Sequence, residues 1–117
     1  MNSNDLKIYC VTNKKVNFID KPEYYFSWVG DKEIPKNYIA CDNGDNIYHK
    51  EKFYSELTFH YWYWKNLLKK ESKKNWIGFC QKRRFWVKES LNSKISKDNI
   101  NDFLITKPLS DWSNYDA

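Results

Sequence analysis

The sequence predicts an α/β protein with an open parallel sheet. Two runs rich in β-branched and aromatic residues indicate strands at 7–12 and 24–29. A third apolar run at 76–80 lacks polar alternation, which is typical of a strand buried on both faces of a parallel sheet. A helical pattern at 55–70 precedes this run, so the order strand, helix, strand indicates a right-handed crossover connection.

The segment 55–70 carries the strongest helix pattern in the chain. Ser55 is the expected N-cap, and Glu56 lies in the first turn. Four apolar residues recur at the positions i, i+4, i+7 and i+11, which predicts one apolar stripe. These residues are Leu57, Tyr61, Trp64 and Leu68. Phe59, Trp62 and Tyr63 widen the apolar surface on either side.

Weaker patterns complete the predicted architecture. The stretch 34–44 contains Pro35 and a turn signal, and is expected to be irregular with a short strand at 38–40. A short helix is expected at 98–103 and a further strand at 103–106. With 117 residues, the chain is expected to form one domain over 1–117.

Composition excludes several classes of protein. Hydrophobic residues make up 41% and charged residues 30%, which argues against disorder. No apolar run can span a bilayer and the first residues do not resemble a signal peptide, so we expect a cytoplasmic protein. The three cysteines are too far apart for a CxxC motif, and we expect reduced thiols. His49 and His60 lack ligand-like partners, so a zinc site is not expected.

Charge is unevenly distributed along the chain. The segment 65–97 holds eleven basic residues against Glu71 and Glu89, a net +9, and the remainder of the chain is −4. Such a block favours a polyanionic or phosphorylated partner, although a solvated lysine-rich surface has the same composition. Aromatic residues reach 19%, and they suit either a small core or stacking on sugars and bases.

The positions of the arginine residues indicate one candidate site for a phosphate group. Eighteen of the twenty basic residues are lysine, and the two arginines are adjacent, Arg83 and Arg84. They follow the predicted strand 76–80, and ligands of open parallel sheets lie beyond the carboxyl ends of the strands. Guanidinium groups match phosphate oxygens well, so we expect this pair to stabilise a phosphate group, unless the two only form structural ion pairs.

Other groups near this edge are candidates for substrate binding. Gln81 and Lys82 precede the arginine pair, and Thr12 and Asn13 end the first predicted strand. Glu56 is a candidate acid facing the arginines, or simply a first-turn helix charge. No Asp-x-Asp motif occurs, so a divalent metal is doubtful, and fixed cations can stabilise the phosphate charge in its place.

Three segments together resemble a known family. They are Asp42-Asn-Gly-Asp-Asn-Ile47, Tyr54-Ser-Glu-Leu-Thr-Phe-His-Tyr-Trp-Tyr-Trp-Lys-Asn66 and Trp76-Ile-Gly-Phe-Cys-Gln-Lys-Arg-Arg-Phe-Trp86. Their order resembles the bacterial family of domain of unknown function 4422, whose members look like glycosyltransferases of capsule, exopolysaccharide and lipopolysaccharide assembly. The resemblance implies a GT-A-like, Rossmann-like open sheet with a crossover helix. It also implies a nucleotide-sugar donor, a glycan acceptor and a peripheral association with the inner membrane surface.

The resemblance also implies which residues act. Matching positions are Glu56, Thr58, Tyr61, Trp62, Trp64, Lys65, Asn66, Gly78, Arg83 and Arg84. The expected catalytic residues are Arg83, Arg84 and Glu56. The expected substrate-binding residues are Thr12, Asn13, Asp45, Asn46, Tyr61, Trp64, Lys65, Gln81 and Lys82.

Two departures from the family qualify this expectation. The family places His-Tyr before the arginine pair, where this chain has Gln81-Lys82. The chain ends at Ala117, short of a whole family domain, so we expect an incomplete domain and a donor-binding half that can be inactive alone. Two alternatives stay open: a basic, aromatic-rich nucleic-acid-binding module, and an inert remnant. The first is not preferred, because no known nucleic-acid-binding motif occurs.

Overall fold

The computed structural model describes residues 6–71, 75–82, 84–88, 95–109 and 112 of the chain. Four parallel strands form one sheet in the order β3–β2–β1–β4. The strands are β1 (Leu6–Thr12), β2 (Tyr24–Trp28), β3 (Ile39–Ala40) and β4 (Trp76–Gln81). The α/β prediction is therefore confirmed. Strands are predicted at 7–12, 24–29, 38–40 and 76–80, and each prediction is correct to within one residue at either end.

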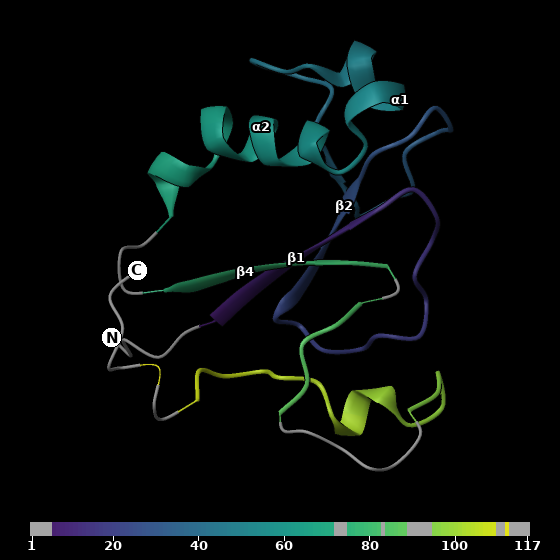
Figure 1. Cartoon of the computed structure of the whole chain (residues 1–117), viewed down its shortest axis with the longest axis vertical. Coiled ribbons are helices and arrows are strands. Elements are labelled where there is room, and N and C mark those ends of the chain that lie inside the picture. Colours follow the sequence, from purple (N-terminus) through teal and green to yellow (C-terminus); the bar gives the residue numbers. More distant parts are fainter. Residues whose placement is uncertain (1–5, 72–74, 83, 89–94, 110–111, 113–117) are drawn as a thin grey trace.

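The sheet lies between two layers (Figure 1). Helix α2 (Leu57–Asn66) crosses one face, and the segment that contains the short 3-10 helix η3 (Ile100–Asp102) runs beneath the other. The central strand β1 is buried on both faces. Tyr9 and Val11 belong to the core on the α2 side, and Leu6 and Ile8 belong to the core on the η3 side. This burial on both faces explains the nearly continuous apolar sequence of β1.

The prediction of one continuous helix over 55–70 is wrong. The segment instead forms η1 (Tyr48–Lys50), α1 (Glu51–Tyr54), α2, and η2 (Leu68–Lys70). Ser55 is not an N-cap, since the structure gives it a φ of +48° and no side-chain capping bond is made at the start of α2. A non-glycine residue with positive φ cannot continue a helix, so the chain changes direction there.

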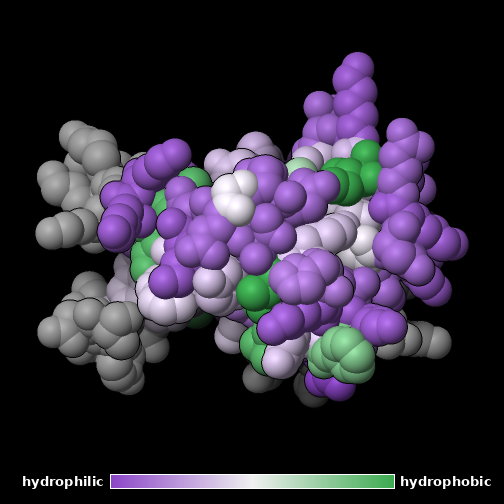
Figure 2. Space-filling view, turned by 90° about the horizontal axis from the view of Figure 1, so that it is seen from above, coloured by the Kyte–Doolittle hydropathy of each residue, from purple (hydrophilic) through white to green (hydrophobic). Residues whose placement is uncertain are grey.

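The predicted apolar stripe of α2 faces solvent. Phe59, Trp62 and Tyr63 form the buried side of the helix, whereas Leu57 is 57% and Trp64 54% exposed. Figure 2 looks onto this helical side and shows small apolar patches interrupted by hydrophilic side chains. Aromatic residues lie on both sides of this helix, and periodicity alone therefore could not identify the buried side.

The C-terminal predictions are wrong in type. The predicted helix 98–103 is reduced to the single 3-10 turn η3, and residues 103–106 do not form a strand. Leu104 makes only an isolated antiparallel bridge with Val87. Leu104 and Ile105 are nevertheless buried beneath the sheet, which accounts for their apolar sequence. All three cysteines are free thiols, as predicted.

Candidate functional site

The strand order creates a topological switch point between β1 and β4. The chain passes from β1 to β2 and β3 on one side, and then returns to pair β4 with the opposite side of β1. In open α/β sheets, a crevice forms beyond the carboxyl ends of the two strands at such a point. The loops after β1 and β4 are therefore the first place to look for a site.

A polar cavity of about 460 Å³ lies at this point. Its lining comes from the ends of β1, β2 and β4 and the residues that follow them, from the start of α1, and from the α1–α2 junction. The lining residues are Val11, Thr12, Asn13, Val29, Glu51, Ser55, Glu56, Gln81, Lys82 and Arg84. Six of the twelve predicted site residues thus meet in one cavity, although they come from three separate segments of the sequence.

A second, apolar cavity of about 420 Å³ adjoins the polar cavity. The two share four lining residues: Val11, Glu56, Gln81 and Arg84. The remaining lining is mostly aromatic or aliphatic, and includes Phe79, Phe85 and Trp86. The indole Nε1 of Trp86 donates to the backbone oxygen of Phe79 at 2.9 Å, which fixes the ring beside β4 while 53% of the residue stays exposed.

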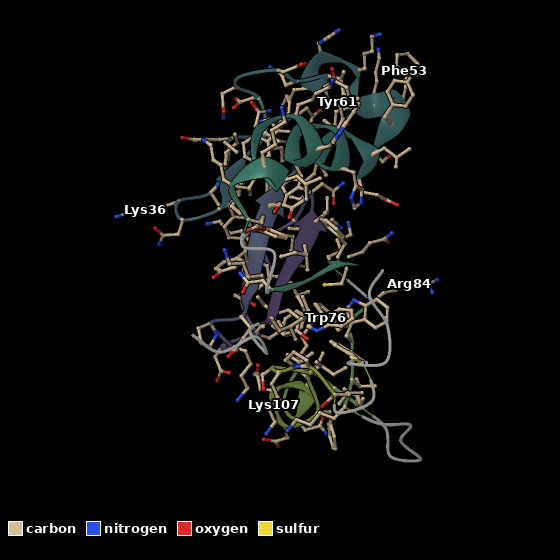
Figure 3. All side chains as sticks on the ribbon, turned by 90° about the vertical axis from the view of Figure 1, so that its left-hand side faces the viewer. Lys36, Phe53, Tyr61, Trp76, Arg84 and Lys107 are labelled. Carbon is tan, nitrogen blue, oxygen red and sulfur yellow. The ribbon has the colours of Figure 1, made fainter. Side chains whose placement is uncertain are left out.

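The end of β4 is shaped by a tight turn. Gln81 and Arg84 exchange two backbone hydrogen bonds, N to O, of 3.2 and 3.0 Å. The turn reverses the chain and brings the exposed Arg84 side chain to the edge of both cavities. Figure 3 shows this side chain projecting outward between the helical layer and the lower layer. Arg83, the other predicted arginine, lies outside the described residues.

Two polar contacts connect the loops around the cavity. The Gln81 amide Nε2 donates to the Glu56 carboxylate Oε1 at 2.9 Å, which joins β4 to the start of α2. The Lys82 ammonium donates to the Asn13 side-chain oxygen, which joins β4 to the loop after β1. Glu56 therefore contacts an amide here. Within the described ranges, the ion pair found is Lys7 with Glu71, so no carboxylate neutralises Arg84 there.

Several residues that line the polar cavity are not among the predicted site residues. Glu51 belongs to no motif, and the sequence predicts a capping role for Ser55. The only signal at Ser55 is structural: its positive φ, a kind of strain that often occurs at functional sites. His60 is half-buried, and its ring centroid lies 4.8 Å from that of Phe79. Burial lowers the pKa of His60, partly opposed by the charge of Glu56.

Five predicted substrate-binding residues do not line either cavity. Asp45, Asn46, Tyr61, Trp64 and Lys65 belong to the loop before η1 and to α2. The Tyr61 hydroxyl donates to the Asp45 carboxylate at 2.8 Å, and the Lys65 ammonium lies 3.9 Å from the Trp64 ring centroid. Asn46 accepts a hydrogen bond from the Tyr48 backbone N–H at 3.0 Å. The Tyr61–Asp45 bond joins the loop to the helix, whereas the other two contacts are local to the helix and to the loop.

Gly44 shows why that loop needs its sequence. Its φ is +59°, and a Cβ at this position would collide with the Asn66 side chain. Asn66 in turn donates to the Asp45 backbone oxygen at 2.8 Å, and Trp62 Nε1 donates to the Asn43 backbone oxygen at 3.0 Å. The two motif segments 42–47 and 54–66 are therefore close-packed partners in the fold.

The described part of the chain contains no group of three or more His, Cys, Asp or Glu side chains that could hold a metal ion. Among the described residues, no helix has the length and apolar character needed to cross a membrane.

The fold and site define a Rossmann-like α/β protein with a ligand-sized cavity at the switch point of its sheet. More particularly, the chain belongs to the family described as Domain of unknown function (DUF4422), which matches it over residues 7–113. No curated protein and no solved structure matches the chain.

Proposed function

We propose that this chain binds a nucleotide-sugar donor and acts, whole or as the donor-binding half, in a cytoplasmic glycosyltransferase of cell-surface polysaccharide assembly. The observation that carries the proposal is the convergence of Thr12, Asn13, Glu56, Gln81, Lys82 and Arg84 on one cavity at the switch point. The likeness to GT-A enzymes, noted in the sequence, suggests the same class of ligand.

The charges of the cavity suit a diphosphate. Arg84 offers a planar group that can contact two phosphate oxygens, and the Lys82 ammonium, which is bonded to the Asn13 side-chain oxygen, offers a single charge nearby. Because no described carboxylate pairs with Arg84, its guanidinium is available to an incoming anion. A fixed cation at this place would stabilise the charge that develops as the diphosphate leaves.

The adjoining apolar cavity suits the uncharged part of a donor. Trp86 presents an exposed ring that is held by its hydrogen bond to Phe79, so a flat base or the apolar face of a sugar can stack on it. A donor lying across the two cavities would place its phosphates near Arg84, which lines both.

The proposed reaction uses these parts in a simple way. An acceptor hydroxyl oxygen bonds to the anomeric carbon of the donor sugar, and the bond from that carbon to the diphosphate oxygen breaks. The nucleoside diphosphate leaves with the electron pair, and the hydroxyl proton passes to a base. Glu56 is our candidate base, because its carboxylate lies in the cavity and is oriented by the Gln81 amide.

Titration calorimetry with a panel of nucleoside diphosphates and their sugars tests the proposal, with and without Mg²⁺. We expect one nucleotide class to bind, and Arg84→Gln to weaken it at least about tenfold, the loss of one charge-assisted contact. Lys107→Gln is the matched control, since Lys107 is exposed at the far end of the molecule (Figure 3). If a folded protein binds none of the panel, or if both variants weaken binding equally, the proposal fails.

A further inference from the structure

A third cavity shares the lining residue Lys82 with the polar cavity. It has a volume of about 620 Å³ and combines four lysines with an apolar floor. We call it the basic cavity. Its lysines are Lys14, Lys15, Lys82 and Lys97, and its apolar lining is Val16, Phe18, Phe85, Val87, Ile95 and Ile100.

Among the described residues, the charged lining of the basic cavity is of one sign. No described Asp or Glu lines it, and none of its lysines forms an ion pair with a described carboxylate. Asp98 follows Lys97 in the sequence but does not line the cavity. A concave surface with charges of one sign attracts counter-ions more strongly than the same charges spread over a flat surface.

Side-chain packing and a hydrogen bond hold the apolar floor of the basic cavity in place. Phe18 and Phe85 meet edge to face, with ring centroids 6.0 Å apart, and Val16 and Ile100 beneath them are buried. The Asn101 side chain donates to the Phe18 backbone oxygen at 2.8 Å, which holds this loop in place. The Lys97 ammonium lies 5.4 Å from the Phe18 ring centroid, so one charge sits directly beside the apolar floor.

These two properties together define a ligand class. We propose that the basic cavity binds an organic phosphate that carries an apolar group, with the phosphate among the lysines and the apolar group on the phenylalanine floor. Phosphate is favoured over carboxylate because several single charges suit a group that carries about −1.5 to −2 at neutral pH. An inorganic ion alone would leave the apolar floor uncovered, and the cavity has the size of typical small-molecule sites.

The position of the basic cavity relates it to the first proposal. Lys82 lines both the polar and the basic cavity, so two anionic ligands would lie side by side. If the polar cavity holds the sugar donor, as the proposed function requires, the organic phosphate is part of the acceptor substrate, and a hydroxyl group carried by that same molecule attacks the donor sugar. The binding proposal itself does not depend on that function.

The probe for the first experiment is octyl phosphate below its micelle concentration, measured by calorimetry with the whole chain. Octyl glucoside, octanoate and inorganic phosphate are the comparison ligands. We expect octyl phosphate to bind at least about tenfold more tightly than each of these, which corresponds to about 1.4 kcal/mol. Equal binding of inorganic phosphate or octanoate would overturn the proposed ligand class, and so would equal binding of octyl glucoside.

Lysine variants locate the site. Lys15→Gln and Lys97→Gln are each expected to weaken octyl phosphate about fivefold and to reduce the salt dependence of binding. Lys36→Gln and Lys107→Gln are the matched controls, because these exposed lysines do not line the cavity. If the controls weaken binding as much as the cavity variants, the lysines act only as a diffuse positive surface and the site is disproved.

Two further arms separate the possible sources of the phosphate and the two proposals. Vesicles of phosphatidylcholine with and without phosphatidylglycerol show whether the phosphate is a lipid headgroup or a soluble molecule. Preferred binding of an oligonucleotide would contradict the proposal.

Nucleotide binding is expected to survive Lys15→Gln and Lys97→Gln, and octyl phosphate binding to survive Arg84→Gln, so either proposal can fail while the other stands.

Discussion

Glu71 and Glu56 are two carboxylates near opposite ends of the sheet, and their surroundings differ. The Glu71 side chain is only 5% exposed and accepts hydrogen bonds from Lys7 at 2.9 Å, Tyr9 at 2.6 Å and Tyr63 at 2.9 Å. Glu56 is half-buried beside the polar cavity, and the one hydrogen bond to its carboxylate in the described structure is from Gln81. One carboxylate is enclosed by donors, and the other is open to a ligand.

The comparison separates a structural charge from a functional candidate. Burial alone would raise the pKa of Glu71, but hydrogen bonds from Tyr9, Lys7 and Tyr63 outweigh it, so the net shift is downward. A buried charge with all its partners joins elements that are distant in sequence, here β1 and the end of the α2 layer. A carboxylate with free acceptor capacity in a cavity is instead available for substrate.

The largest predicted effect is on the enclosed carboxylate. Glu71→Ala is expected to lower the free energy of unfolding by about 3–5 kcal/mol, because it leaves the Lys7 charge and two tyrosine hydroxyls without their partner. Urea denaturation of the variant measures this loss. A loss below 1 kcal/mol would show that the cluster contributes little and would weaken the contrast with Glu56.

Lowering the pH should reduce the stability of the fold through protonation of Glu71. Because the folded state lowers the pKa of Glu71 below its ordinary 4.5, its stabilisation is complete above that value and disappears as the pH falls below it. Glu71→Gln lacks this titration. The stability difference between the wild type and Glu71→Gln is therefore expected to shrink between pH 5 and pH 3, measured by thermal unfolding. A constant difference would mean that the charge of Glu71 is not what stabilises the fold.

Removal of one hydrogen-bond donor to Glu71 should lower the free energy of unfolding less than removal of Glu71 itself. Tyr9→Phe keeps the buried ring and removes only the hydroxyl, so it should cost about 1.5–3 kcal/mol, the range for a hydrogen bond to a charged group. Tyr38→Phe, which removes a hydroxyl bonded to the Val16 backbone, is the control for loss of an ordinary neutral bond. Equal losses in the two variants would argue against a special role for the Glu71 charge.

The smallest stability effect is expected at the open carboxylate. Glu56→Ala should change the free energy of unfolding by about 0.5 kcal/mol or less, since Glu56 is half-exposed and its partner Gln81 can bond to water. If our functional proposal holds, the same variant reduces glycosyl transfer far more than it reduces stability. A stability loss as large as that of Glu71→Ala would make Glu56 structural as well.

Much of the site could be predicted from the sequence, because it depends on local patterns at strand ends. Once β1 and β4 are recognised as parallel strands, the edge of the sheet at their carboxyl ends can be assigned four of the site residues: Thr12, Asn13, Gln81 and Lys82. Glu51 and Ser55 could not, because the break between α1 and α2 depends on a backbone conformation that the sequence pattern did not reveal.

The sequence by itself determined the strands, because runs rich in β-branched and aromatic residues favour extended structure. It did not determine their burial: β1 is buried on both faces, whereas the run 76–80, which we expected to be buried on both faces, forms the edge strand β4 and is partly exposed. It also placed the only two arginines immediately after the last strand. Only the tertiary structure decided which side of α2 is buried, because aromatic residues on both sides of the helix satisfy the same periodicity. Packing against Tyr9 and Phe79 selects Phe59 and Tyr63 for the core and leaves Trp64 in solvent.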